Sequence, residues 1–178
     1  MTDLLFYVRA VHFAATLSVA GAVFFSVMIA EPAFRRAKSD PGVAAAIRKR
    51  LAWIAWVSLL VALISAVPWL VLVAESMSSQ PLGALYAQGV LATVLTQTDF
   101  GIDWLSRVVL ACALGGLFVH VFNLKGPSSR TLQAVTAVLA AAYAGSLAWT
   151  GHAIGGQGVE GVLHPAADVL HLVAAAVW

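Results

Sequence analysis

The sequence predicts an all-α fold, a polytopic bundle of transmembrane helices that forms a single domain over residues 1–178. Of its residues, 61% are hydrophobic and only 10% are charged. Soluble domains have about 45–50% apolar and about 25% charged residues, so lipid must cover much of this surface. The net charge is only +2, and the basic residues are clustered rather than spread over a face. We therefore expect a bilayer and no nucleic acid as partner.

Five apolar stretches reach or approach the roughly 20 residues that a membrane-spanning helix needs. The predicted helices are at about 4–30, 51–74, 103–123, 131–150 and 165–178. The first ends at Glu31-Pro32, and Pro68 predicts a kink or a loosened turn in the second. Pro165 would be the first residue of the last helix, which places His164 at its N-cap.

The last predicted helix is too short to cross the membrane. From His164 to Trp178 it would extend about 21 Å, less than the hydrocarbon core of about 30 Å. We therefore expect the chain to be the N-terminal part of a longer protein. The moderately apolar segment 81–101 predicts a short helix on the outer membrane surface, and a re-entrant segment is the alternative.

Basic residues predict the orientation of the helices. The loop 31–50 and the loop after the third predicted helix carry Lys and Arg, whereas the connections 75–102 and 151–163 carry none. The positive-inside rule places the basic loops in the cytoplasm. The sequence thus predicts a multi-pass membrane protein with its N-terminus on the outer side of the membrane.

Four of the five histidines fall at or just inside the predicted outer face: His12, His152, His164 and His171. Ionisable residues within a bilayer are costly and by default mark a functional site, and imidazole is the commonest metal ligand. His12 and His171 would lie about 12 Å and about 10 Å along their helices from that face. Because they reach a similar depth from different helices, a shared ligand could bridge them.

One face of the last predicted helix carries His164, Asp168 and His171, at spacings of i, i+4 and i+7. The Asp168 carboxylate could orient a neighbouring imidazole, as acidic residues do around metal sites. His164 and His171 are about 10 Å apart along the axis. We therefore expect two successive stations on a metal path rather than one site.

Two arginines are embedded beside these groups. Arg9 precedes His12 by three residues, and Arg107 follows Asp103 by four, which favours an ion pair on one helix. We expect structural pairing or snorkelling for both. The functional alternative is that Arg9 or Arg107 supports the site, by pairing with Asp168 or by binding an anionic group such as a haem propionate.

The residues leave three function classes open. The first is a membrane protein that binds or transports a metal, and the second is a b-type haem protein for electron transfer, ligated by two histidines. The third is a non-catalytic assembly subunit. We expect no enzyme, because the sequence has no Walker loop, no GxGxxG and no CxxC.

Three stretches carry a resemblance to a known family. The segment TGHAIGGQGVEGVLHPAADVLHLVAAAVW, the early RAVHF helix and the stretch LTQTDFGIDWLSR resemble bacterial copper resistance protein D. The resemblance implies a polytopic inner-membrane protein that takes copper from the periplasm toward the cytoplasm, beside a small periplasmic copper-binding protein. Carried onto this sequence, it implies that the copper ion is handled by His12, His152, His164, Asp168 and His171.

Overall fold

The computed structural model describes residues 2–37, 40–78, 82–122, 129–150 and 160–177, and these residues form helices joined by short turns without any strand. This confirms the predicted all-α class. The helices are α1 (Thr2–Phe24), a π-helical segment η1 (Phe25–Ala30), α2 (Glu31–Ala37), α3 (Pro41–Ser78), α4 (Leu82–Ala87), α5 (Val90–Gln97), α6 (Asp99–Val121), α7 (Arg130–Gly145), a 3₁₀ segment η2 (Ser146–Thr150) and α8 (Glu160–Val177).

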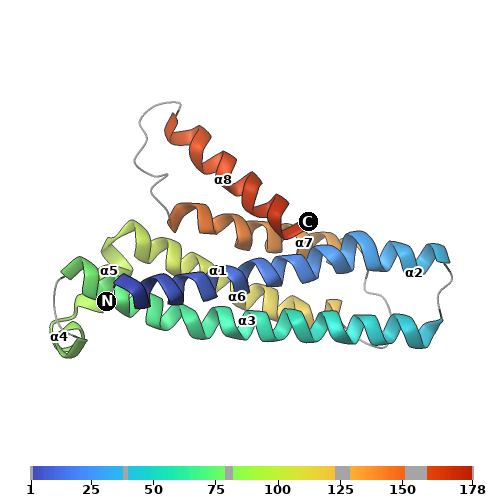
Figure 1. Ribbon diagram of the computed structural model, residues 1–178, viewed down its shortest axis with the longest axis horizontal. Coiled ribbons are helices and arrows are strands. Elements are labelled where there is room, and N and C mark those ends of the chain that lie inside the picture. The colour runs from blue at the N-terminus through green and yellow to red at the C-terminus, as the bar shows by residue number, and fades with distance from the viewer. Residues whose placement is uncertain (1, 38–39, 79–81, 123–128, 151–159, 178) are drawn as a thin grey trace.

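Four of the helical stretches in the described part of the chain are long and apolar enough to cross a membrane: Asp3–Ala37, Pro41–Ser78, Asp99–Val121 and Arg130–Thr150. They lie roughly parallel in Figure 1, while α8 is shorter and crosses the bundle obliquely. The N-terminus lies at the end of the bundle that also holds α4 and α5, which we call the N-terminal end. The opposite end holds α2 and is called the α2 end.

The first helical stretch continues past the predicted stop at Glu31-Pro32 and ends at Ala37. Proline lacks the N–H that would continue the α-helical pattern. The turn before it is π-helical, and the backbone N–H of Glu31 donates to the Ser26 carbonyl. A local change of register of this kind lets the helix accommodate a proline without ending.

Helix α3 begins at Pro41, ten residues before the predicted start at 51. The Asp40 side chain accepts hydrogen bonds from the backbone N–H groups of Gly42 (2.6 Å) and Val43 (3.3 Å). An aspartate cap followed by proline at the first helical position is a favourable helix start. The extension is held to the preceding helix by a bidentate ion pair, in which Arg48 donates to Glu31 at 2.6 Å and 3.0 Å.

The segment predicted as one short helix forms two, α4 and α5, separated at Gly89, whose φ of 68° lies in the left-handed region. Helix α5 turns sharply into α6 at Thr98, whose hydroxyl donates to the Val94 carbonyl (2.6 Å) and accepts from the Gly101 N–H (3.1 Å). Gly101 is buried against the backbone of Val94 and Leu95, with no room for a Cβ atom. The turn therefore requires glycine at this position.

Helix α8 begins at Glu160, so Pro165 lies inside the helix and the prediction of His164 as N-cap is wrong. Two glycines allow α8 to approach the bundle closely. A Cβ atom on Gly21 of α1 would lie 3.1 Å from the Ala176 carbonyl oxygen, and one on Gly145 of α7 would lie 3.0 Å from Val169. Small residues permit such approach between membrane helices.

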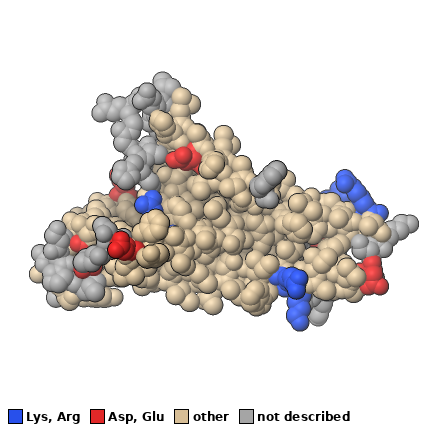
Figure 2. Space-filling model, viewed as in Figure 1, with Lys and Arg blue, Asp and Glu red and all other residues tan. Residues whose placement is uncertain are grey.

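Charged residues are unevenly distributed along the bundle. Figure 2 shows most of the visible Lys and Arg surface toward the α2 end and most of the visible Asp and Glu surface toward the N-terminal end. The sequence shows the same asymmetry, with basic residues in α2, in the first three turns of α3 and at the start of α7: Arg35, Arg36, Arg48, Lys49, Arg50 and Arg130. The asymmetry matches the basic loops on which the predicted orientation depends.

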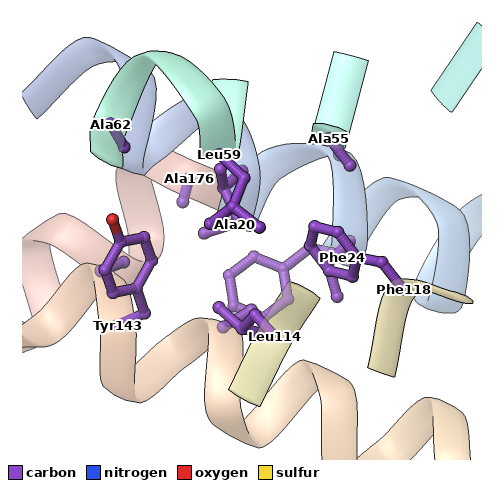
Figure 3. Close-up of a cluster of buried hydrophobic side chains, with 14 of the residues drawn as sticks. Ala20, Phe24, Ala55, Leu59, Ala62, Leu114, Phe118, Tyr143 and Ala176 are labelled. Atoms are coloured by element: carbon purple, nitrogen blue, oxygen red, sulfur yellow. The ribbon is translucent and has the colours of Figure 1, made fainter. Parts of the chain in front are cut away.

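The main apolar core lies between α1, α3, α6 and α7 (Figure 3). Its largest fully buried side chains include Val19, Leu114, Phe118 and Tyr143. Between them lie many alanines, so the helices pack closely at this level. A smaller cluster joins α3 to α4 and α5 at the N-terminal end, around Leu70 and Leu85.

The Gly101 turn yields a prediction with a matched control. Gly101→Ala should destabilise the protein by about 1–3 kcal/mol, because the added methyl group overlaps the backbone of α5. Gly116→Ala, on the same helix with open space around the position, should leave the melting temperature unchanged or raise it. Thermal unfolding in detergent measures both. Equal melting temperatures for the two variants would show that the turn tolerates a side chain.

Candidate functional site

His12 lies at the centre of a polar cluster within the bundle. Its side chain is 2% exposed. The imidazole Nδ1 lies 3.0 Å from both the Ala62 carbonyl oxygen and the Ser65 hydroxyl of α3, and Nε2 lies 2.7 Å from Nη2 of Arg107 on α6. Because a guanidinium can only donate, Nε2 is the acceptor. Nδ1 therefore carries the proton and donates toward Ala62.

Arg107 is the second centre of this cluster and is 3% exposed. Its guanidinium donates to the Ser146 hydroxyl of η2 at 2.8 Å and to the Thr16 hydroxyl of α1 at 3.3 Å. Its Cζ atom lies 5.9 Å from the ring centre of Trp69 and 5.4 Å from that of Tyr143. Neutral acceptors and aromatic faces thus surround a buried cation, and they come from α1, α3, α7 and η2.

Side chains of neighbouring helices contact α3 near Pro68, which lies inside this helix. Proline at this position leaves the Ile64 carbonyl without its helical donor. In this region the Trp104 indole N–H donates to the Ala66 carbonyl at 2.9 Å, while His12 contacts the Ala62 carbonyl. Side chains of α1 and α6 therefore attach to α3 at carbonyls on either side of Ile64.

A cavity of about 10 Å³ adjoins the cluster, lined mainly by apolar atoms of α3 and α6 together with His12, Arg107 and Tyr143. This volume accommodates about one water molecule. Nearby, Asp103 Oδ2 and Arg107 Nε are buried and have no hydrogen-bond partner among the described residues. The expected Asp103–Arg107 ion pair is therefore not formed, because the Nη atoms of Arg107 point to His12, Thr16 and Ser146 instead.

The predicted ligands on α8 have a different environment. His164, Asp168 and His171 are all exposed and lie on one side of this helix. The alternative in which Asp168 pairs with Arg9 or Arg107 is not seen in the described part of the chain, where the Glu31–Arg48 pair is the one salt bridge. Arg9 donates instead to the Thr150 carbonyl at 3.1 Å.

The structure does not bring the predicted ligands into one group. The neighbours of the His12 imidazole are Ala62, Ser65, Trp69 and Arg107, and His171 is not among them. Within residues 2–37, 40–78, 82–122, 129–150 and 160–177, no three His, Cys, Asp or Glu side chains lie close enough to hold a metal ion. The predicted ligand His152 lies outside the described residues.

Comparison with known proteins identifies the family. Residues 1–162 match the family model described as copper resistance protein D-like, N-terminal domain. The chain belongs to the copper resistance protein D-like family. Copper resistance protein D of Pseudomonas syringae pv. tomato is 32% identical to it over 147 residues, which are 81% of this chain and 44% of the relative. The chain thus spans less than half of that relative's length, and no solved structure matches it.

Membership confirms the resemblance seen in the sequence and makes the chain a copper-related, multi-pass membrane protein. Sequence reasoning about this copper resistance protein D-like chain missed the contact between His12 and Arg107. A signal was present, because both residues are polar and fall inside apolar stretches. Their 95-residue separation gave no reason to pair them.

The cluster predicts that His12 contributes strongly to stability. His12→Ala should lower the stability by about 3 kcal/mol, because it removes the Nε2 acceptor of a buried guanidinium and the donor to Ala62. His120→Ala is the matched control, since His120 is exposed near the end of α6. Thermal unfolding in detergent compares the two. If His12→Ala unfolds at the wild-type temperature, His12 does not hold the helices together.

Proposed function

We propose that this chain is a copper-binding and copper-transport protein of a bacterial inner membrane, which takes copper ions from the periplasm toward the cytoplasm. The observation that carries the proposal is the exposed face of α8, where His164, Asp168 and His171 lie at successive turns. Copper is the substrate. Its identity follows from the family, since imidazole ligands alone suit several metals.

The spacing on α8 determines how copper could be held. His164 and Asp168 are four residues apart and Asp168 and His171 are three apart, so each pair can meet on the helix surface. The two histidines are about 10 Å apart along the axis and would act in succession. His152, which precedes α8 in the chain, would join His164 at the entrance. Asp168 would orient the imidazoles.

His12 would be the deeper station, and Arg107 controls its availability. The Nε2 lone pair of His12 points at a cation 2.7 Å away. A copper ion cannot share that position, because it would be repelled by the guanidinium. His12 can therefore bind copper only if the Arg107 guanidinium moves away from Nε2. Arg107 would then keep its hydrogen bonds to Ser146 and Thr16. Arg9 would support the N-terminal end of the bundle through its hydrogen bond to the Thr150 carbonyl.

The charge distribution supports the proposed orientation. The basic α2 end would face the cytoplasm and the N-terminal end the periplasm, in accord with the positive-inside rule. A small periplasmic copper-binding protein would then deliver copper to the end where α8 begins. The relative is more than twice as long as its matched region, so we propose that this chain acts as the N-terminal part of a longer transporter. No catalytic step is proposed.

A haem ligated by His12 and His171 does not fit these residues. His12 Nε2 is bonded to Arg107, and the adjoining cavity of about 10 Å³ is far smaller than a porphyrin. The His171 side chain is exposed on another helix. The geometry therefore favours copper handling over haem-based electron transfer.

The proposal predicts a loss of copper binding when the α8 ligands are removed. His164→Ala/His171→Ala should weaken copper binding by more than tenfold, and Asp168→Asn by about 10–100-fold, because it removes an orienting carboxylate. Titration of the detergent-purified chain with Cu⁺ and, separately, with Cu²⁺ measures the affinities. His120→Ala should bind copper as the wild type does.

Two results would contradict the proposal. Unchanged copper affinity in the double variant would exclude α8 as the copper site. A lower melting temperature with unchanged copper binding would indicate that these histidines serve only in assembly of the bundle.

A further inference from the structure

The N-terminal end of the bundle has few basic side chains. Eight of the ten Lys and Arg residues lie in the segments 35–50 and 125–130, which leaves Arg9 and Arg107. Arg107 is buried in the bundle, with its Nη atoms hydrogen-bonded to His12, Thr16 and Ser146. Among the Lys and Arg side chains that the structure describes at this end, Arg9 is therefore the one that an external anion can reach, since it is only partly buried.

Among the described residues, Arg9 uses one of its donors in a hydrogen bond. Nη2 donates to the Thr150 carbonyl at 3.1 Å, and the guanidinium carbon lies 5.2 Å from the ring centre of Phe13. A guanidinium has five N–H donors. Among the described residues no carboxylate forms an ion pair with Arg9. A phosphate is a natural counter-ion here, because it matches the planar donor geometry of arginine.

An apolar groove runs beside this cation on the surface of α1. A cavity of about 250 Å³ is lined by Phe6, Arg9, Ala10 and Phe13, which lie on one helical face at i, i+3, i+4 and i+7. Phe6 is 67% exposed. The groove thus offers one cationic group and otherwise apolar surface, the combination presented to a phospholipid at the boundary between headgroups and acyl chains.

The length of the first helical stretch places Arg9 at that boundary. Asp3–Ala37 has 35 residues, or about 52 Å of helix, whereas the hydrocarbon core is about 30 Å thick. If the excess is divided between the two ends, about seven residues at each end lie outside the core. The boundary then falls close to Arg9, with Phe13 one turn deeper.

We propose that Arg9, Phe6, Ala10 and Phe13 form a phospholipid-binding site on α1. The guanidinium of Arg9 binds the lipid phosphate, and an acyl chain lies along the groove past Phe6 and Phe13. The lipid phosphate would place a negative charge beside the Arg9 guanidinium, which joins α1 to the Thr150 carbonyl. This site is independent of the copper proposal, because it uses none of the residues assigned to copper.

Native mass spectrometry of the full chain in detergent, with phosphatidylglycerol added, tests the site. Arg9→Gln should weaken binding of the tightest-bound lipid by tenfold or more, since a charge-assisted hydrogen bond is lost. Arg9→Lys keeps the charge and should lie between wild type and Arg9→Gln. Arg130→Gln, an exposed arginine at the start of α7, is the matched control and should bind lipid as the wild type does.

A second variant separates the acyl contact from the charge. Phe6→Ala leaves Arg9 in place and should shorten lipid retention, whereas inorganic phosphate at millimolar concentration should not displace the lipid. Equal lipid affinity in wild type and Arg9→Gln would overturn the proposal. Displacement by inorganic phosphate would also overturn it, because the site would then bind a free anion.

Discussion

A buried guanidinium shared between four helical elements is the constraint on which the rest of the bundle depends. A charge at membrane depth is costly unless protein groups surround it. Arg107 meets this requirement with His12 and Thr16 from α1, Ser146 from η2, and the aromatic faces of Trp69 and Tyr143. None of these partners is anionic. The cluster therefore fixes the rotation of α1, α3 and α6 through hydrogen-bond geometry rather than through charge neutralisation.

This constraint divides the histidines into two kinds. His12 uses both ring nitrogens within the bundle, one toward α3 and one toward α6. The α8 histidines lie on an exposed face of the helix. Other residues of α8 pack against Gly21 of α1 and Gly145 of α7. This chain of the copper resistance protein D-like family thus has exposed imidazoles on α8 and an enclosed imidazole on α1 that is hydrogen-bonded to a cation. Under the proposed function, copper would reach the α8 imidazoles before it reaches His12.

Much of the fold could be predicted from composition and hydrophobic runs, and the helix ends could not. The apolar stretches predicted where the helices lie, because burial in lipid requires about 20 apolar residues. They could not predict that α3 begins at Pro41, since the charged run 48–50 separates its first turns from the long apolar stretch, and these turns depend on the Asp40 cap and on Arg48. Hydropathy also does not indicate the π-helical turn before Pro32.

The candidate site was predicted only in part, for a similar reason. The i, i+4, i+7 spacing correctly placed His164, Asp168 and His171 on one side of a helix. Depth along a helix suggested that His12 and His171 could share a ligand, but depth says nothing about which way a side chain faces. His12 turns toward α3 and α6, whereas His171 is exposed. Contacts between residues 95 positions apart need the packed bundle.

The most direct test of this account is nitrogen NMR of the histidine-labelled protein during titration with Cu²⁺. The His12–Arg107 contact predicts that neutral His12 carries its proton on Nδ1 and accepts at Nε2. The proposed function also predicts that the first additions of copper broaden the His164 and His171 signals and leave His12 sharp. A His12 with its proton on Nε2, or one that broadens together with His171, would contradict the central role of the His12–Arg107 contact.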